Sequence, residues 1–324
     1  MSKVIVTGAG GFIGSHLTEL LVKKGLEVKA FVHYNSKNDW GWLEFSDVKN
    51  EIDIISGDIR DYDSVNYALR DCHAVFHLAA LIGIPYSYVS PKAYIETNII
   101  GTYNILQATK ELRLEQALIT STSETYGTAQ YVPIDEKHPY VAQSPYAASK
   151  ISADQLATSF YRSFSLPVKI VRPFNTYGPR QSARAFIPSV ISQVLAEKKK
   201  IRLGNLIPSR DLTFVSDTCK GFYEIYEAQN LVGETTNVGM GNEISMMKLV
   251  TKILSIMNAK IEIELDQERV RPLHSEVERL VCNNKKLISN TSWEPDYNID
   301  KGLLETIVWM QKNQSIYKHL IYNI

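Results

Sequence analysis

The sequence predicts an α/β fold with a doubly wound parallel sheet and a smaller, mixed α/β region toward the C-terminus. Over the first 172 residues, short apolar runs rich in β-branched residues alternate with stretches of helical periodicity. Such alternation is typical of strand–helix–strand units, whose parallel strands carry helices on both faces. After about residue 172, proline, glycine and arginine become frequent and the apolar runs shorten. We therefore expect domains over 1–172 and 173–324, with residues from about 205 to 240 able to return to the first.

The chain opens with a strand, a glycine-rich break and a helix. Residues 4–7 form an apolar run typical of a buried strand, and the glycines from 8 to 11 interrupt it. Residues 12–24 then show helical spacing of apolar side chains, and Gly25 is a typical helix stop. The next strand is expected over 28–32.

The same reasoning predicts the later elements. Further strands are expected at 52–55, 73–77, 117–119, 168–171, 212–215, 235–238 and 261–263, and further helices at 61–70, 92–112, 146–164, 186–197, 216–229 and 245–257. The run Lys198-Lys199-Lys200 is interpreted as an exposed helix end, where cations suit the helix dipole.

Composition excludes several classes of protein. The chain has 324 residues, of which 44% are hydrophobic, and its 35 basic residues balance its 35 acidic ones. That balance gives no general attraction to nucleic acid or anionic membranes. Three scattered cysteines and seven histidines without ligand spacing argue against disulfides and metal sites. No apolar run is long enough to span a bilayer, and Met1-Ser2-Lys3 leads straight into a strand, so we expect a cytoplasmic protein.

A glycine loop joins the first strand to the first helix. Residues 8–14 read Gly-Ala-Gly-Gly-Phe-Ile-Gly, in the pattern G-x-x-G-x-x-G. Glycine lets the backbone turn sharply and approach a pyrophosphate, and the helix N-terminus offers unpaired N–H groups. This context predicts a Rossmann-type dinucleotide site with contacts from Gly8, Gly11, Phe12, Ile13 and Gly14.

The ends of the second and third strands leave the cofactor type open. An acidic residue after the second strand would bind the adenosine ribose of NAD, but the chain has His33-Tyr34-Asn35-Ser36-Lys37 there. His33, Ser36 and Lys37 can instead face a 2′-phosphate. Asp58-Ile59 follows the third strand, where the carboxylate can accept from the adenine amino group or cap a helix.

A polar run follows the strand at 117–119. Residues 120–127 read Thr-Ser-Thr-Ser-Glu-Thr-Tyr-Gly and lie where chemistry is found in doubly wound sheets, although a polar capping loop has the same composition. Of three Tyr-x-x-x-Lys matches, only Tyr146/Lys150 follows a helix start, Ser144-Pro145. Tyr146 and Lys150 then share one helix face.

These residue types suit the oxidation of an alcohol. A free tyrosine has a pKa of about 10 and is a poor base at neutral pH. The ammonium of Lys150 and a positive nicotinamide ring favour the tyrosinate. Tyr146 can then take the proton of a substrate hydroxyl as hydride leaves the same carbon, with Thr122 orienting that oxygen.

Taken with further motifs, the chain resembles the extended short-chain dehydrogenase/reductase superfamily. The likeness includes His77-Leu78-Ala79-Ala80, Asn98-x-x-Gly101-Thr102 and Arg172-Pro173-Phe174-Asn175. Thr122-Ser123-Glu124 resembles nucleotide-sugar 4,6-dehydratases, many of which carry Thr-Asp-Glu, whereas 4-epimerases lack the glutamate. The Thr-Ser-Glu form is similar to GDP-mannose 4,6-dehydratases. Tyr34-Asn35-Ser36, Trp40-Gly41-Trp42 and residues 179–184 resemble GDP-N-acetylglucosamine 4,6-dehydratases of the legionaminic-acid route.

The resemblance implies a mechanism. Tyr146 removes the C4 hydroxyl proton while hydride passes to the nicotinamide, Glu124 removes the C5 proton, water leaves from C6, and the hydride returns to C6. Ser123 stands where aspartic acid is often found. Either Glu124 also protonates the leaving hydroxyl, or Ser123 relays a proton through water.

The resemblance also implies binding residues and partners. NAD is the expected cofactor, with NADP not excluded, and Leu78 and Ala80 add to its contacts. Asn175, Arg180, Arg210 and Arg271 are implied around the nucleotide diphosphate, Glu276 on its ribose and Arg184 on the sugar side. The expected substrate is GDP-linked, and helices 92–112 and 146–164 are expected to form a homodimer.

The sequence leaves open two other functions and the role of two tryptophans. A 4-epimerase would use the same Thr122, Tyr146 and Lys150, and a non-catalytic nucleotide sensor would use the same scaffold. Trp40 and Trp42 can belong to a lid or simply pack.

Overall fold

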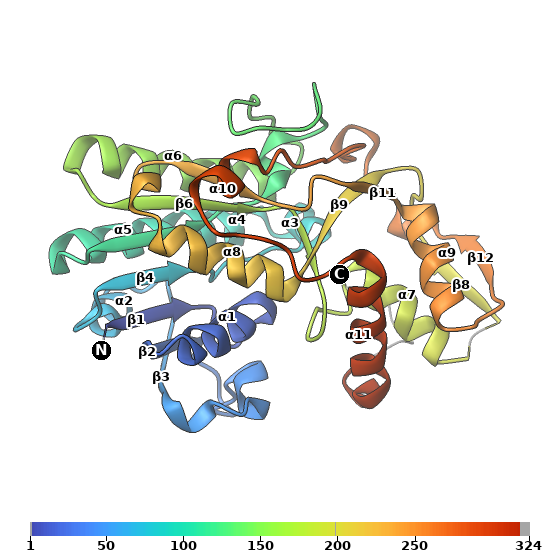
Figure 1. Ribbon diagram of the computed structural model, residues 1–324, viewed down its shortest axis with the longest axis horizontal. Coiled ribbons are helices and arrows are strands. Elements are labelled where there is room, and N and C mark those ends of the chain that lie inside the picture. The colour runs from blue at the N-terminus through green and yellow to red at the C-terminus, as the bar shows by residue number, and fades with distance from the viewer. Residues whose placement is uncertain (1, 198, 318–324) are drawn as a thin grey trace.

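The fold is described from a computed structural model, which covers residues 2–197 and 199–317. Its centre is a parallel sheet of seven strands in the order β10-β6-β5-β4-β1-β2-β3 (Figure 1). The strands are β1 (Lys3–Thr7), β2 (Glu27–His33), β3 (Ile52–Gly57), β4 (Ala74–His77), β5 (Gln116–Thr120), β6 (Val168–Pro173) and β10 (Thr235–Val238). Because the winding reverses between β1 and β4, a crevice is expected where the carboxyl ends of these strands diverge.

Helices cover both faces of this sheet because successive side chains of a buried strand point to opposite sides. Val4 and Val6 of β1 belong to one hydrophobic cluster, and Ile5 between them belongs to another. The first face carries α1 (Phe12–Lys23) and α8 (Val215–Glu227). The second carries α2 (Tyr62–Leu69), α5 (Gly101–Leu112) and α6 (Pro145–Phe164) (Figure 1).

The mixed region gathers mainly at one end of the molecule (Figure 1). A three-stranded sheet is formed by β7 (Asn175–Tyr177), β9 (Ser209–Phe214) and β11 (Glu243–Ser245), and β8 (Lys200–Leu203) pairs with β12 (Glu262–Leu265). The helices here are α7 (Phe186–Leu195), α9 (Met246–Ile256) and α11 (Ile299–Lys312), while α10 (Lys285–Asn290) packs beside β10.

The predicted fold class is confirmed, and the differences are local. The lysine run is not a helix end, because α7 stops at Leu195 and Lys200 begins β8, whose side chains alternate between exposed and buried. Lys198 lies outside the described residues. The predicted strand at 212–215 is Ser209–Phe214, because Val215 begins α8.

The helix predicted over 92–112 has three parts. It consists of α4 (Pro91–Tyr94), a π-helical turn η3 (Ile95–Ile100) and α5. A short helix before it, α3 (Ile84–Val89), had no periodic signal. Such π-helical turns are rare and are frequent at functional sites.

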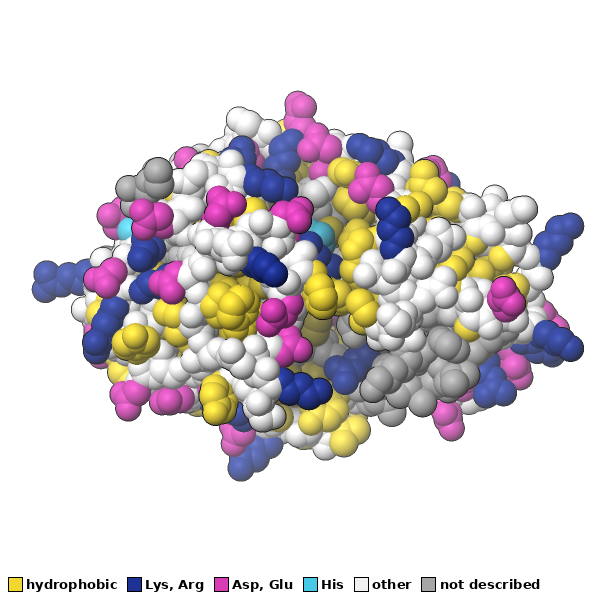
Figure 2. All heavy atoms as spheres, turned by 90° about the horizontal axis from the view of Figure 1, so that it is seen from below, with side chains coloured by type: hydrophobic (Ala, Val, Ile, Leu, Met, Phe, Trp, Pro, Cys, Tyr) yellow, Lys and Arg dark blue, Asp and Glu magenta, His cyan; other side chains and the backbone are white. Residues whose placement is uncertain are grey.

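The surface agrees with the balanced composition. Figure 2 shows acidic and basic side chains interspersed over the face that it presents. Within the described residues, no helix is long and apolar enough to cross a membrane. The division into domains at residue 172 stays a prediction, although β10 does pair with β6 in the main sheet.

Candidate active site

The glycine loop forms a tight cradle at the carboxyl end of β1. Gly8 has a φ of +70°, and a Cβ there would lie 2.8 Å from the backbone nitrogen of Ala79. A Cβ on Gly14 would overlap the carbonyl oxygen of Gly8. Helix α1 begins at Phe12, and its N-cap Gly11 has no side chain that could cap the first N–H groups. The cradle therefore fits a pyrophosphate, which those N–H groups can bind.

The Trp40–Trp42 segment packs against this loop. The Trp42 N–H donates to the carbonyl oxygen of Gly10 at 3.0 Å. Gly41 has a φ of +66°, and a Cβ there would overlap the same oxygen. The Trp42 ring meets that of Trp309 edge to face, with centroids 5.3 Å apart. Packing on the glycine loop is therefore what this segment does in the structure.

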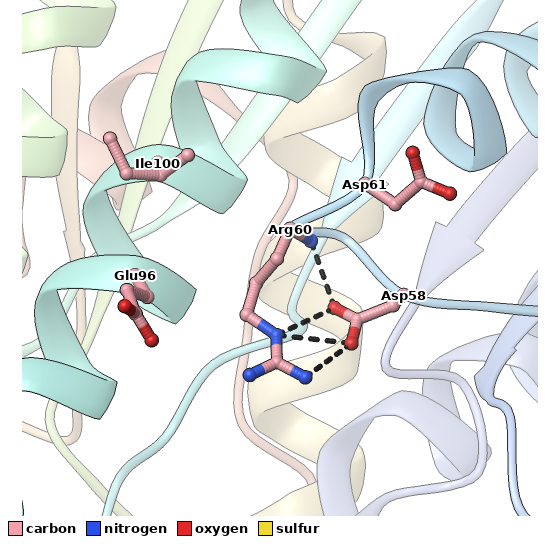
Figure 3. Close-up of a pocket in the computed structure, with 5 residues that line it drawn as sticks. All are labelled: Asp58, Arg60, Asp61, Glu96 and Ile100. Carbon is pink, nitrogen blue, oxygen red and sulfur yellow. Dashed lines mark hydrogen bonds and ion pairs between the residues drawn. The ribbon is translucent and has the colours of Figure 1, made fainter.

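An open pocket of about 450 Å³ lies beyond the end of β3 (Figure 3). It is lined by Asp58, Arg60, Asp61, Glu96 and Ile100. The Arg60 guanidinium holds the Asp58 carboxylate through both Nε and Nη2, and this hydrogen bonding lowers the pKa of Asp58. Sequence reasoning did not single out Arg60. In the structure its guanidinium is bound to the Asp58 carboxylate, so the two residues form one unit at this pocket.

The other predicted cofactor residues lie along the same edge of the sheet. His33 is exposed at the end of β2, and Ile59 is buried against Gly101 of α5. The residues from Leu78 to Ala80 follow β4 beside the glycine loop, where the Ala79 N–H donates to the Thr7 hydroxyl. The structure thus places the residues from Leu78 to Ala80 at the glycine cradle, and His33 and Ile59 farther along this edge.

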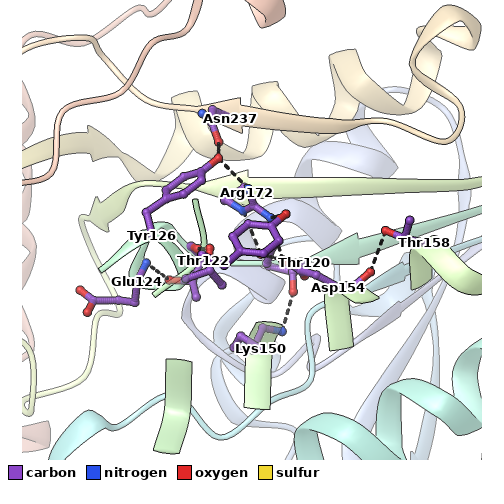
Figure 4. A network of polar contacts seen from close by, with 12 residues as sticks. Thr120, Thr122, Glu124, Tyr126, Lys150, Asp154, Thr158, Arg172 and Asn237 are labelled. Atoms are coloured by element: carbon purple, nitrogen blue, oxygen red, sulfur yellow. Dashed lines mark hydrogen bonds and ion pairs between the residues drawn. The ribbon is translucent and has the colours of Figure 1, made fainter. Parts of the chain in front are cut away.

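Two elements present the predicted catalytic residues. Thr122 caps the short 3-10 helix η4 (Ser123–Tyr126), and its hydroxyl accepts from the Glu124 N–H at 3.3 Å. Helix α6 starts as predicted, with Pro145 at its first position and the Ser144 hydroxyl accepting from the Ala147 N–H. Tyr146 and Lys150 are both almost fully buried on this helix, and Figure 4 shows Lys150 beneath the Thr122–Glu124 segment.

Burial dominates the electrostatics of Tyr146. It raises the pKa of the phenol well above the ordinary value, Glu124 raises it further, and a hydrogen bond with Thr122 lowers it. Lys150 donates to the carbonyl oxygen of Thr120 at 2.5 Å, and burial lowers the pKa of this lysine. For the chain by itself burial therefore raises the pKa of Tyr146, and the expectation that Lys150 and a nicotinamide ring together favour the tyrosinate stays a prediction.

Glu124 shares the site with Tyr146. Its side chain is only 8% exposed, and its charge acts on the Tyr146 phenol and on the Arg210 guanidinium. Ser123 beside it is buried as well. Glu124 thus lies within electrostatic reach of both a phenol and a guanidinium that come from two other elements.

Arg210 and Arg271 flank one carboxylate. Arg210 Nη2 lies 3.5 Å and Arg271 Nη1 lies 3.7 Å from Glu276 Oε1. Asn175 is the first residue of β7, and its buried Oδ1 has no hydrogen-bond partner in the part of the chain that the structure describes. Unpaired buried polar atoms of this kind are unusual in folded proteins and fit a ligand-binding role.

The two remaining predicted arginines lie apart from this group. Burial raises the pKa of Tyr94 to about 12, the nearby charge of Arg184 acts in the opposite direction, and the Tyr94 ring contacts Tyr146. Arg180 is engaged instead by α1, where it donates to the Ser15 hydroxyl and pairs with Glu19 at 2.8 Å. The structure therefore does not group Arg180 with Arg210 and Arg271.

Next to the catalytic residues lie two buried charges to which sequence reasoning gave no role: Arg172, which it quoted only as part of a motif, and Asp154, which it missed. Arg172 lies in β6 and Asp154 lies on α6, one helical turn beyond Lys150. A charged residue inside an apolar strand was the available signal for Arg172. Groups of three or more side chains able to hold a metal are absent from the described residues.

Comparison with known proteins was made for the sequence and for the fold. A family model described as GDP-mannose 4,6 dehydratase matches residues 5–306. A dTDP-glucose 4,6-dehydratase of Xanthomonas campestris pv. campestris is 31% identical over 97% of this chain and 95% of its own length.

Two solved structures share the fold over nearly the whole chain. A dTDP-glucose 4,6-dehydratase from Streptomyces venezuelae, crystallised with NAD and TYD bound, matches with a TM-score of 0.89 and 26% identity, covering 98% of this chain and all of its own. A UDP-glucuronic acid 4-epimerase from Bacillus cereus, in complex with UDP-glucuronic acid and NAD, matches with a TM-score of 0.87 and 26% identity, covering 96% of this chain and 99% of its own. Dehydratases and epimerases thus share this architecture.

Proposed function

Because the chain belongs to the GDP-mannose 4,6 dehydratase family, within the extended short-chain dehydrogenases/reductases, we propose that it is a nucleotide-sugar 4,6-dehydratase with NAD as its cofactor. The observation that carries the proposal is that Glu124 and Tyr146 are both buried and interact electrostatically. A dehydratase needs two bases at neighbouring sugar carbons, and this pair supplies them.

The residues present fit NAD. Gly8 and Gly14 allow the tight turn, the uncapped start of α1 can receive the pyrophosphate, and Asp58 lies at the far strand end for the adenine. When bound, NAD supplies reversible redox chemistry, taking up a hydride from C4 of the sugar and giving it back at C6. NADP is less well supported, since the family members described above were crystallised with NAD.

The chain's own residues supply the proton transfers. Tyr146, oriented by Thr122, is placed to take the proton of the C4 hydroxyl. The C4 ketone acidifies the C5 proton, and Glu124 removes it while the C6 hydroxyl leaves as water. The proton for that water comes from Glu124 or through Ser123, and a proton returned to C5 completes a balanced loss of one water.

Two arginines and one carboxylate suit a substrate that carries a nucleoside diphosphate. Arg210 and Arg271 offer guanidinium groups to a diphosphate, and Glu276 between them can accept from a ribose diol. Asn175 is assigned to the diphosphate as well, and Arg184 to the sugar side of the site. On the resemblance of its motifs we propose a GDP-linked N-acetylhexosamine as the substrate.

A nucleotide-sugar 4-epimerase is the second candidate. The shared fold with the Bacillus cereus epimerase favours it, and Thr122, Tyr146 and Lys150 would serve C4 oxidation equally well. Glu124 favours the dehydratase, because simple inversion at C4 requires no base at C5.

A panel of nucleotide sugars tests the function. The purified protein is incubated with GDP-, UDP-, dTDP- and CDP-linked hexoses and N-acetylhexosamines, and the products are weighed by mass spectrometry. Loss of one water from a GDP-linked sugar supports the proposal in full. An isomer of unchanged mass supports the epimerase, and a protein that leaves every sugar unchanged contradicts both.

We also propose a cytoplasmic homodimer built on α5 and α6. A connected aromatic strip on these helices supports it, since the Phe160 ring contacts both Tyr103 and Phe164, and the last two are 42% and 53% exposed. Light scattering should give twice the mass of one chain. The mass of a single chain at micromolar concentration would contradict the dimer.

A further inference from the structure

A buried ion pair lies near the residues Thr122–Glu124, which we call the catalytic segment (Figure 4). Arg172 Nη2 is 2.7 Å from Asp154 Oδ2, and both side chains are shielded from solvent, with exposures of 0% and 1%. Such a pair is weak evidence for stability, because well-packed apolar residues of similar volume often hold a fold equally well. Its position next to Lys150 therefore invites a different explanation.

The pair holds both ends of the catalytic segment. Ser121 precedes that segment, and its hydroxyl donates to Asp154 Oδ2 at 2.5 Å and accepts from Arg172 Nε at 3.1 Å. Tyr126 follows the segment, and its hydroxyl accepts from Arg172 Nη1 at 2.6 Å. Thr122, Ser123 and Glu124 lie between these two anchors.

The guanidinium also contacts two aromatic rings, which contact each other. Its carbon lies 4.7 Å from the centroid of Tyr126 and 5.0 Å from that of Tyr140. Nη2 donates to the Tyr140 hydroxyl at 2.9 Å, and the Tyr126 hydroxyl donates onward to Asn237 of β10. Several hydrogen bonds and ring contacts thus fix the Arg172 guanidinium, which can in turn hold the residues bound to it in place.

The same pair reaches the helix that carries the phenol and the ammonium. Asp154 lies one turn beyond Lys150 and two turns beyond Tyr146 on α6. Burial lowers the pKa of Lys150, and the Asp154 charge raises it. Within the described residues, His77 of β4 also interacts electrostatically with Lys150, and burial lowers its pKa to about 3, so His77 is neutral. Asp154 therefore favours the charged form of Lys150.

We propose that Arg172 and Asp154 are positioning residues, which lock the Thr122–Glu124 segment to helix α6 and hold Lys150 as an ammonium. The inference rests on the proposed function for its kinetic readout. The rigidity of the segment can be measured without any substrate.

Two tyrosine variants provide a matched test. Tyr126→Phe removes the hydroxyl that ties the segment to Arg172, whereas Tyr140→Phe removes a hydroxyl bound to the same guanidinium but outside the segment. We expect Tyr126→Phe to lower kcat by about tenfold or more with KM nearly unchanged, because small misplacements of catalytic groups are costly. Hydrogen exchange of the 121–127 amides should accelerate in this variant, and Tyr140→Phe should match the wild type in both measurements.

A double variant separates positioning from stability. Arg172→Met combined with Asp154→Leu removes both charges and leaves neither unpaired, so folding is expected to survive, with thermal unfolding as the check. We expect kcat to fall by about a hundredfold in this variant, with faster exchange at 121–127. If the double variant does not fold, Ser121→Ala repeats the measurement at the other anchor.

The pH profile adds a readout that a purely structural pair would not move. In Asp154→Asn the carboxylate charge is lost, so the pKa of Lys150 falls and the ammonium is lost at lower pH. The alkaline limb of kcat should therefore shift to lower pH, whereas in Tyr140→Phe it should stay in place.

The outcomes are distinguishable from failure of the proposed function. If the wild type turns over no nucleotide sugar but exchange at 121–127 still responds to Tyr126→Phe and not to Tyr140→Phe, the function is wrong and the positioning role stands. If exchange and kcat are unchanged in Tyr126→Phe and in the double variant, the positioning role is overturned.

Discussion

Glu124 and Tyr146 are 22 positions apart in the sequence, yet the charge of Glu124 acts on the Tyr146 phenol. Thr122 explains part of the convergence, because it caps the 3-10 helix that presents Glu124 and also bonds to the phenol. One threonine thereby contacts both of the groups that we propose as bases.

Glu124→Gln should separate the two chemical steps. Without a base at C5 we expect dehydration to fall by about a hundredfold or more. Oxidation at C4 needs only Thr122, Tyr146 and Lys150, so cofactor reduction should still be visible by absorbance in the near ultraviolet after sugar is added. A variant that dehydrates at the wild-type rate would remove Glu124 from the mechanism.

For some side chains the sequence alone suggested a role at the candidate site, and for others the fold was needed. Tyr146 and Lys150 were identifiable because a helix start preceded them and their spacing set them on one face. Arg172 and Asp154 were not, since a buried ion pair depends on two elements meeting in space. Arg180 shows the converse, because the fold pairs it with Glu19 of α1, a partner 161 positions away.

Among the elements, the glycine loop carries the most specific geometry. Gly14→Ala should weaken NAD binding by at least about tenfold, because the new Cβ would overlap the Gly8 carbonyl oxygen and push the loop out of shape. Isothermal titration with NAD measures this directly.

Gly83→Ala is the matched control for that substitution. A Cβ on Gly83 would meet its nearest atoms at 3.6 Å, which is ordinary contact, and its φ of −72° suits any residue. NAD affinity should be unchanged in this variant. Equal affinities in the two alanine variants would contradict the role assigned to the loop.

Long periodic elements were predictable, and short ones were not. The helices α1, α2, α6 and α9 begin and end within one or two residues of the predicted bounds. Apolar spacing marked three of them, and Ser144-Pro145 marked the start of α6. β7 and β11 have three residues each, too few for any period to show. α11 is different, since Leu303, Ile307 and Met310 have helical spacing and the signal was overlooked.

Over the whole molecule, buried neutral histidines link stability to pH. Burial is the main cause that lowers the pKa of His77 to about 3, and Lys150 adds to it. The imidazole is hydrogen-bonded to Thr7 and Thr102. Because Thr102 donates to the Asn98 carbonyl, its oxygen is free to accept from Nε2, which leaves Nδ1 to accept from Thr7.

The sign of this linkage follows from the lowered pKa. Below about pH 6.5 the unfolded chain protonates His77 but the folded chain does not, so stability is present above that pH and is lost as the pH falls toward 3. The contribution is at most about 1.4 kcal/mol per pH unit. Asp211 acts in the opposite direction, because burial raises its pKa to about 6.

Urea unfolding at pH 7.5 and pH 5.5 tests the prediction. The difference in unfolding free energy between the two pH values should shrink in His77→Gln, because the titrating group is gone. His274→Gln, which changes an exposed histidine, should retain the wild-type difference. Identical pH dependence in the His77 variant and the wild type would show that His77 titrates normally in the folded chain.

For the whole chain, the sequence predicted the fold class but not the full strand order. Alternating strands and helices indicated a parallel doubly wound sheet, and the carboxyl ends of its strands do carry the candidate site. The sequence indicated that residues from about 205 to 240 can return to the first domain, but not that β10 pairs with β6 at the edge of its sheet. The four residues of β10 follow a long segment in the mixed region.

Conversion of GDP-N-acetylglucosamine in heavy water, followed by mass spectrometry and NMR, tests the central proposal most directly. If Tyr146 and Glu124 act in turn on one sugar, the product loses one water and gains a single deuterium at C5. A product of unchanged elemental composition, inverted at C4 and without deuterium at C5, would contradict the account.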